Sequence, residues 1–171
     1  MNIVLIGYRG TGKSVVGKLL ALHLGMPCIG MDSKIAARSG MSIPEIVERF
    51  GWTEFRDLES KMVLELSGLD NIIMDTGGGV IERPENIEAL KKNSRIFWLQ
   101  ASVDTIVRRI QADTQRPALT TGKTFTEEVA EVLEQRISKY KSAAQYEIDT
   151  NALTPEQVAG KIIEIICSRK R

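Results

Sequence analysis

One stretch decides the fold of this chain: Ile3-Val4-Leu5-Ile6-Gly7-Tyr8-Arg9-Gly10-Thr11-Gly12-Lys13-Ser14. The four apolar residues have the length and β-branched character of a buried strand, and the eight that follow match the P-loop pattern G-x-x-x-x-G-K-[ST] in full. Apolar residues then recur at helical spacing up to Leu24, where Gly25 ends the pattern. A glycine-rich turn before a helix is the plainer alternative, but chance would supply the full pattern only ~0.009 times in such a chain. The order of strand, loop and helix predicts a nucleoside triphosphate site.

The chemistry of that site follows from the residue types. Glycines let successive backbone N–H groups converge on phosphate oxygens, and the helix N-terminus adds positive charge. The Lys13 ammonium suits the β- and γ-phosphates of ATP, and the Ser14 hydroxyl suits Mg²⁺. We therefore expect nucleotide contacts from the following residues: Gly10, Thr11, Gly12, Lys13, Ser14 and Val15.

Composition narrows the remaining possibilities. The chain has 171 residues and a net charge of +1, which favours one domain over residues 1–171 with no field to attract nucleic acid or an anionic membrane. A monomer is expected. No apolar run reaches the ~20 residues of a membrane span, and the start of the chain lacks a cationic leader. Two distant cysteines, Cys28 and Cys167, read as small buried hydrophobes, although they could in principle pair. A cytoplasmic protein is expected.

Short apolar runs alternate with amphipathic stretches along the whole chain, which predicts α/β architecture. The expected strands are 3–6, 27–31, 71–75, 95–99 and 146–149. The expected helices are 14–24, two short ones within 32–50 broken near Gly40, and then 52–67, 85–92, one beginning at 102, 127–143 and 155–167. Right-handed crossovers make such a sheet parallel, with helices on both faces and ligands beyond the carboxyl ends of its strands.

The P-loop alone does not distinguish a kinase from other nucleotide-binding proteins. The chain lacks the N-K-x-D stretch of guanine-specific domains and is shorter than the large ATPases, which favours a small kinase. The expected third strand ends in Asp75, as in a Walker B strand, where the carboxylate could support Mg²⁺. A strand-ending Asp that caps the next turn is the alternative. Gly77, Gly78 and Gly79 then suit a loop whose backbone approaches a ligand.

Six segments together make the chain resemble the shikimate kinase family over essentially its whole length: GYRGTGKS at 7–14, MDSKIAARSGMSI at 31–43, EFRDLE at 54–59, TGGGV at 76–80, QRPAL at 115–119 and EQRISKY at 134–140. The resemblance implies a three-layer P-loop kinase fold of the nucleoside monophosphate kinase type, with a five-stranded parallel sheet in the order 2-3-1-4-5. It also implies ATP-dependent phosphorylation of the 3-hydroxyl of shikimate, a step of aromatic amino-acid biosynthesis, with Mg²⁺ as cofactor.

The resemblance also implies the roles of individual residues. Asp32 would orient the accepting hydroxyl and take its proton, within an acceptor region of about 32–61. Shikimate would be bound by Asp32, Arg56, Gly77, Gly78, Gly79 and Arg136. A lid at about 112–124 would bring Arg116 to the transferring phosphoryl group, while Arg109 and Asn151 would contact adenine. Taken singly, without the family pattern, Arg56 and Arg136 are better interpreted as solvated helix charges. For Arg116, an ordinary surface arginine before a turn-forming proline is the weaker alternative.

One departure from the family pattern suggests a relocated carboxylate. The resemblance implies Asp-x-Asp after the second strand, where this chain has Gly30-Met31-Asp32. We therefore expect Ser14, Asp32 and Asp75 around Mg²⁺, with Asp75 replacing the acid absent at position 30. A kinase of another hydroxy acid such as gluconate, and a nucleotide-binding module without transfer activity, remain the alternative functions.

Overall fold

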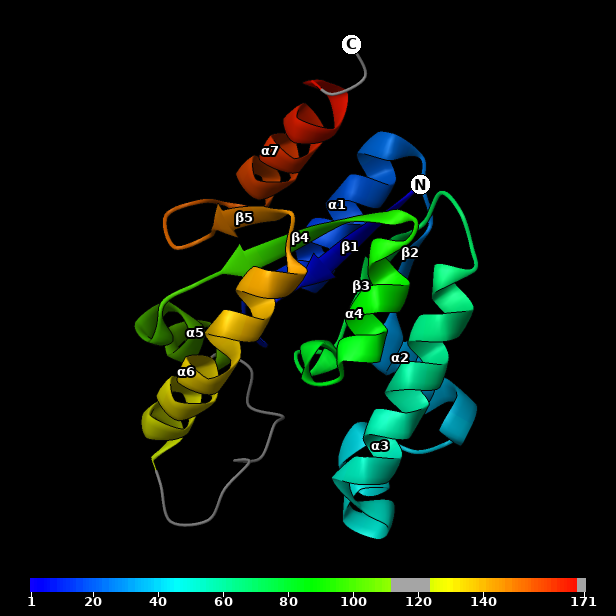
Figure 1. The fold of residues 1–171 in the computed structure, drawn as a ribbon. Coiled ribbons are helices and arrows are strands. Elements are labelled where there is room, and N and C mark those ends of the chain that lie inside the picture. Colours follow the sequence, from blue (N-terminus) through cyan, green and yellow to red (C-terminus); the bar gives the residue numbers. More distant parts are fainter. Residues whose placement is uncertain (112–123, 169–171) are drawn as a thin grey trace.

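The computed structural model describes residues 1–111 and 124–168, whose strands form one five-stranded sheet in the order β2-β3-β1-β4-β5 with every pairing parallel (Figure 1). The α/β class and the strand order predicted for the chain are confirmed. The elements are, in chain order, β1 Asn2–Ile6, α1 Lys13–Leu24, β2 Cys28–Gly30, α2 Met31–Ser39, α3 Ile43–Ser67, β3 Ile73–Asp75, the 3-10 turn η1 Val80–Glu82, α4 Pro84–Lys91, β4 Ser94–Gln100, α5 Val103–Gln111, α6 Phe125–Ala143, β5 Tyr146–Asp149 and α7 Pro155–Ser168.

Helices cover both faces of the sheet because successive strand residues point to opposite sides. In β1, which is buried along its whole length, Ile3 and Leu5 pack with residues of α1 and α7, whereas Val4 and Ile6 pack with residues of α2, α3 and α4. Figure 1 shows α1 and α7 lying together on one side of the sheet. This two-faced burial accounts for the short, uninterrupted apolar runs of the sequence.

The region after β2 folds as helices separated at glycines. Gly40 ends α2 with a left-handed φ of 63°. Ser42 and Glu45 then form a reciprocal capping box at the start of α3, with Pro44 in its first turn. At Gly51, φ is 83° and ψ is 169°, so the long α3 consists of two helical segments that meet at a kink. The break predicted near Gly40 and the separate helix predicted from Trp52 are both confirmed.

Several element bounds differ from the expected ones by one or two residues, and one expectation about burial was wrong. β3 begins at Ile73, two residues later than expected, since Asn71 has a left-handed φ of 60° that extended backbone does not allow. Both cysteines are free, and the expectation that both are buried was wrong for Cys167, which is exposed on the last turn of α7. Cys28 is partly buried beside Gly17, where burial raises the pKa of its thiol.

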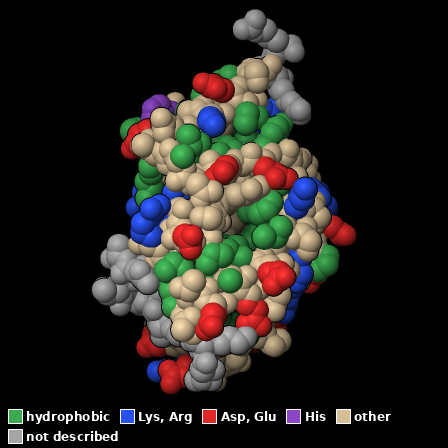
Figure 2. All heavy atoms as spheres, turned by 90° about the vertical axis from the view of Figure 1, so that its left-hand side faces the viewer, with side chains coloured by type: hydrophobic (Ala, Val, Ile, Leu, Met, Phe, Trp, Pro, Cys, Tyr) green, Lys and Arg blue, Asp and Glu red, His purple; other side chains and the backbone are tan. Residues whose placement is uncertain are grey.

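The described surface agrees with the near-zero net charge. On the face shown in Figure 2, acidic and basic side chains are interspersed with apolar ones. Among the described helices, none is long and apolar enough to cross a bilayer.

Candidate active site

The phosphate-binding geometry is set by the backbone between β1 and α1. Gly10 and Gly12 have φ values of 80° and 94°, which side chains with a Cβ rarely adopt. The Thr11 hydroxyl donates a 2.8 Å hydrogen bond to the Tyr8 carbonyl and closes the loop from inside. An ideal Cβ on Gly7 would lie 2.5 Å from the Leu99 carbonyl oxygen, so the loop packs tightly against the end of β4. α1 begins at Lys13, so its N-terminus faces the same space.

A cavity of about 370 Å³ lies over this loop. Most of the residues expected to bind ATP line it: Gly10, Gly12, Lys13, Ser14, Val15 and Arg109. The Lys13 side chain is only 8% exposed. Its ammonium donates hydrogen bonds to the Gly7 and Tyr8 carbonyls at 2.9 and 3.0 Å, which holds the charge at the cavity wall.

Ser14 and Asp75 meet at the edge of the phosphate cavity. The Ser14 hydroxyl donates a 2.5 Å hydrogen bond to Asp75 Oδ2, and both residues line the cavity. Asp75 is the register partner of Gly30 in the β2–β3 ladder. The position that lacks a carboxylate and the position that carries one are therefore direct neighbours on adjacent strands. A hydroxyl and a carboxylate are the oxygen donors that Mg²⁺ prefers, so these two side chains fit the ion expected here.

Arg109, on α5, joins the P-loop to the segment after β5. Its guanidinium donates to the Gly10 carbonyl at 3.3 Å, to the Thr150 hydroxyl at 3.0 Å and to the Thr150 carbonyl at 2.7 Å. Partial burial, together with neighbouring Arg108, lowers the pKa of Arg109. Asn151 accepts from the Ser102 N–H and donates to Asp149, and it does not line the cavity. The buried Thr150, which sequence reasoning missed, is the residue of this segment that contacts Arg109.

A second cavity, of about 700 Å³, lies between α2, α3, α6 and the glycine loop 77–79. It is lined by all six residues expected to bind the acceptor: Asp32, Arg56, Gly77, Gly78, Gly79 and Arg136. Those residues come from positions more than 100 apart in the chain. Ile43, Val47, Trp52 and Phe55 supply an apolar wall. The structure thus brings the expected acceptor residues together around one space.

Arg56 is held on three sides. Its Nη1 donates to Glu59 Oε2 at 2.5 Å, and its guanidinium carbon lies 5.4 Å from the Trp52 ring centroid and 5.1 Å from that of Phe55. Glu59 is fully buried, and burial raises the pKa of its carboxyl although Arg56 opposes the shift. Sequence reasoning missed Glu59, whose spacing of three residues from Arg56 on a helix was the available signal.

At two of its three positions the glycine loop comes so close to these side chains that it has no room for a side chain of its own. An ideal Cβ on Gly79 would overlap the Arg56 guanidinium. One on Gly77 would lie 2.7 Å from Glu59 Oε1 and 2.8 Å from Asp32 Oδ1. Glycine at positions 77 and 79 is therefore explained by close packing against the charged groups of the acceptor cavity, whereas a Cβ on Gly78 would make only ordinary contacts, the nearest at 3.6 Å.

Arg136, on α6, is positioned from the opposite side. Its Nε donates to Glu82 Oε1 at 2.6 Å and its Nη1 donates to the Gly78 carbonyl at 3.4 Å. Glu82 also pairs with Lys139, and although partial burial opposes them, Lys139 and Arg136 lower the pKa of its carboxyl. The Tyr140 hydroxyl donates to the same Gly78 carbonyl, and burial raises the pKa of that hydroxyl. Glu82 and Tyr140 were not singled out from the sequence.

The two cavities share a wall made by Arg9, Asp32, Ser33 and Gly78. Asp32, in the first turn of α2, therefore faces both spaces. A group that leaves the phosphate cavity at this wall enters the acceptor cavity directly. Arg116 and the expected lid up to residue 123 lie outside the described residues, and Thr124 is the N-cap of α6.

A complete P-loop, a sheet ordered β2-β3-β1-β4-β5 and a second cavity beside the phosphate site define a P-loop kinase of the nucleoside monophosphate kinase type. A family model described as shikimate kinase matches residues 9–167. The chain belongs to the shikimate kinase family.

Individual relatives agree with this assignment over nearly full length. The chain is 44% identical over 163 residues to a shikimate kinase of Thermodesulfovibrio yellowstonii, covering 95% of this chain and 93% of the relative. It is 40% identical over 164 residues to a shikimate kinase of Caldicellulosiruptor bescii, covering 96% and 94%. Among solved structures, a shikimate kinase from Acinetobacter baumannii in complex with shikimate superposes with a TM-score of 0.92 at 33% identity, covering 99% of this chain and 94% of that one.

Proposed function

We propose that this protein transfers the γ-phosphoryl group of ATP to the 3-hydroxyl of shikimate, producing 3-phosphoshikimate and ADP. One observation carries the proposal: the six residues expected to bind the acceptor line a single cavity that shares a wall with the phosphate cavity. Family membership supports the reaction and the acceptor.

The acceptor cavity suits a small polyhydroxylated carboxylate. Arg56 and Arg136 bring two guanidinium groups to it, and guanidinium groups bind carboxylates through paired hydrogen bonds. Asp32 and the backbone of the glycine loop supply hydrogen-bonding groups for hydroxyls. Trp52 and Phe55 give the cavity an apolar side that suits the ring carbons.

The reaction is an in-line displacement in which the acceptor oxygen forms a bond to the γ-phosphorus and the bond from that phosphorus to the ADP oxygen breaks. Asp32 orients the accepting hydroxyl from the shared wall and holds its proton as the new bond forms. Lys13 stabilises the charge on the phosphate oxygens from the other side, and Arg116 adds a second cation. Mg²⁺, when bound with ATP, would offset the negative charge of the phosphates, and Ser14 and Asp75 would hold it.

A coupled ADP-release assay with purified protein, ATP and Mg²⁺ tests the acceptor. Shikimate should give turnover and gluconate should give none, because the cavity pairs two arginines for a carboxylate with an apolar wall that suits ring carbons. Turnover with gluconate but not shikimate would assign a different hydroxy acid. ADP release that does not depend on any acceptor would instead indicate an ATPase. Nucleotide binding without turnover would indicate a binding module.

We further propose that Asp75 supports Mg²⁺ in place of the carboxylate absent at position 30. The 2.5 Å contact with Ser14 and the register pairing with Gly30 support the assignment. Asp75→Asn should raise the Mg²⁺ concentration needed for half-maximal activity by about 10-fold, and it should weaken Mn²⁺ binding to the ADP complex as followed by electron paramagnetic resonance. Gly30→Asp added to Asp75→Asn should restore part of both. An unchanged metal requirement in Asp75→Asn would reject the relocation.

We also propose that the protein acts as a monomer in the cytoplasm, with small-molecule substrates and without nucleic-acid or membrane partners. The net charge of +1 and the interspersed surface charges support the part of this proposal that concerns nucleic acid and membranes. Size-exclusion chromatography with light scattering should give one species near 19.0 kDa. A stable dimer would overturn the monomer proposal.

A further inference from the structure

Arg9 is the arginine in the wall between the two cavities, and neither the sequence motifs nor the proposed mechanism uses its side chain. It lies in the middle of the P-loop, and its side chain is 15% exposed. An ideal Cβ on Gly78 would lie 3.6 Å from the Arg9 backbone nitrogen, so the P-loop and the glycine loop meet at this residue. Arg9 thus lies where the two substrates come together.

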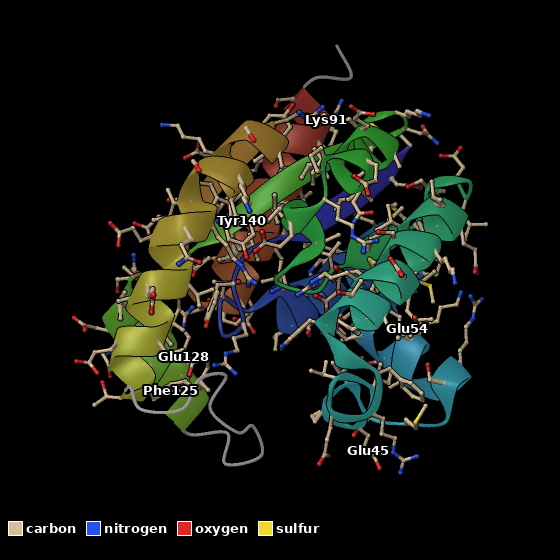
Figure 3. The ribbon with its side chains drawn as sticks, turned by 60° about the horizontal axis from the view of Figure 1, so that its bottom comes forward. Glu45, Glu54, Lys91, Phe125, Glu128 and Tyr140 are labelled. Carbon is tan, nitrogen blue, oxygen red and sulfur yellow. The ribbon has the colours of Figure 1, made fainter. Side chains whose placement is uncertain are left out.

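The first turns of α6 hold the Arg9 guanidinium in place. Nη2 donates to Glu128 Oε1 at 3.3 Å, and the guanidinium carbon lies 5.3 Å from the Phe125 ring centroid and 5.7 Å from that of Tyr8. Figure 3 shows Phe125 and Glu128 on these turns, with Tyr140 further along the same helix. A capping box between Thr124 and Glu127 fixes where the helix begins.

The buried ion pair between Arg9 and Glu128 is a weak way to stabilise the fold. Glu128 is 1% exposed, and burying an ion pair often stabilises a fold less than apolar packing would. The 3.3 Å separation is longer than the ~2.8 Å of a strong charged hydrogen bond. Arg9 Nε is buried and has no hydrogen-bond partner among the described residues. Of the five N–H donors of a guanidinium, the described residues engage one here, on Nη2.

The carboxylate of Asp32, in the same wall, would repel a phosphate group placed beside it, and a nearby cation would offset that repulsion. Asp32 is a carboxylate, and the proposed reaction places a phosphate group beside it on the acceptor side. Lys13 lines only the phosphate cavity, whereas Arg9 lines both. As the phosphoryl group passes from ATP to the acceptor, Arg9 is the cation of this wall that can remain beside it.

We propose that Arg9 binds the transferred phosphoryl group on its acceptor side, and therefore recognises the phosphate monoester product, with Glu128 as its positioning residue. The inference rests on the proposed function. The ligand class is the phosphate ester of a small hydroxy acid, distinguished from the unphosphorylated acid by its phosphate alone.

Calorimetric titration of shikimate and of 3-phosphoshikimate into the protein tests this assignment without turnover. Arg9→Met should weaken 3-phosphoshikimate binding about 10- to 100-fold, the loss expected for a charged hydrogen bond, and shikimate binding less than about 3-fold. Glu128→Gln should give a smaller loss with the same preference for the phosphorylated ligand. Arg95→Met is the matched control, because Arg95 is partly buried at the other end of β4 and lines neither cavity.

The results distinguish a failure of the Arg9 proposal from a failure of the proposed function. An equal loss for both ligands, or a loss for neither, would overturn the role of Arg9 while leaving the proposed function intact. Failure of the unmodified protein to bind or phosphorylate shikimate would instead remove the proposed function. Should Arg9→Met lose its fold by circular dichroism, Arg9→Lys decides, since it keeps the charge and should retain part of the phosphate preference; no preference in that variant would reject the inference.

Discussion

The two cavities of this protein are built by different means. The phosphate cavity is made by backbone conformations within one short segment, residues 7–14, at the end of a fully buried strand. The acceptor cavity is made by side chains brought together from α2, α3, the glycine loop and α6. A backbone cradle can be recognised in eight consecutive residues, whereas a side-chain cavity exists only once distant elements have packed.

The two cavities also differ in how their charges are satisfied. Lys13 is held by the carbonyls of its own loop. Arg56 and Arg136 are instead held by carboxylates. Arg56 pairs with Glu59, three residues later on α3, and Arg136 pairs with Glu82, 54 residues earlier on η1. Changes to the phosphate cavity should therefore affect the chemical step, and changes to the acceptor cavity should affect acceptor binding.

The largest effect is expected for Lys13→Met. Removing the ammonium takes away charge stabilisation in the transition state, so kcat should fall by about 10³-fold or more. Shikimate binding by calorimetry should change less than about 2-fold, because Lys13 does not line the acceptor cavity. A comparable loss of shikimate affinity would show that the two cavities are not separable in this way.

Arg136→Ala should have the next largest effect, and this effect should be on the KM for shikimate. Losing one guanidinium of the carboxylate site should raise the KM for shikimate by about 100-fold and that for ATP by less than about 3-fold. Lys139→Ala is the matched control, since Lys139 lies on the same helix and pairs with the same Glu82 but does not line the cavity. Equal effects of Arg136→Ala on both KM values would mean that Arg136 does not bind the acceptor.

Gly79→Ala should have an intermediate effect that comes from shape alone. The added Cβ would overlap the Arg56 guanidinium, which Glu59 and two aromatic rings hold in place. Displacing that guanidinium should raise the KM for shikimate about 10-fold with little change in kcat. Gly160→Ala, on α7, has open space at its Cβ and should leave kinetics unchanged. An acceptor KM unchanged in Gly79→Ala would show that Arg56 is free to move aside.

Much of the fold could be predicted because its signals are local. The apolar runs, the P-loop and the glycines at 40 and 51 each act on neighbouring backbone, whereas the strand order came from the resemblance to a family. The candidate acceptor residues were also named through that resemblance. Their partners were missed, since nothing near Glu82 or Tyr140 in the sequence indicates that both contact groups from elements far away.

The smallest effect concerns an ion pair that lies outside both cavities. Arg38 and Lys34 on α2 pair with Glu65 on α3, and hydrogen bonding from Arg38 lowers the pKa of Glu65 from 4.5 to about 2. Because the pKa is lower in the folded state, the stabilisation is present above about pH 4.5 and is lost as the pH falls towards 2. Glu65 is exposed, so the effect is small and weakened by salt.

Thermal unfolding followed against pH checks this. Glu65→Gln should lower the Tm slightly at pH 7, and the difference from the unmodified protein should disappear as the pH falls towards 2. Glu54→Gln, which also removes an exposed carboxylate from the same helix, is the matched control and should leave the Tm at pH 7 unchanged. A constant difference at all pH values would assign the effect to packing, and unchanged shikimate kinetics would confirm that the pair lies outside the acceptor site.

In the proposed reaction, a phosphoryl group passes from ATP to the acceptor at the wall that the two cavities share. Phosphorus NMR of a reaction containing the protein, Mg²⁺, ATP and shikimate tests it most directly. We expect one equivalent of ADP for each equivalent of a phosphate monoester on the shikimate 3-hydroxyl. Inorganic phosphate released without that ester, or a phosphate ester formed on gluconate and none on shikimate, would contradict it.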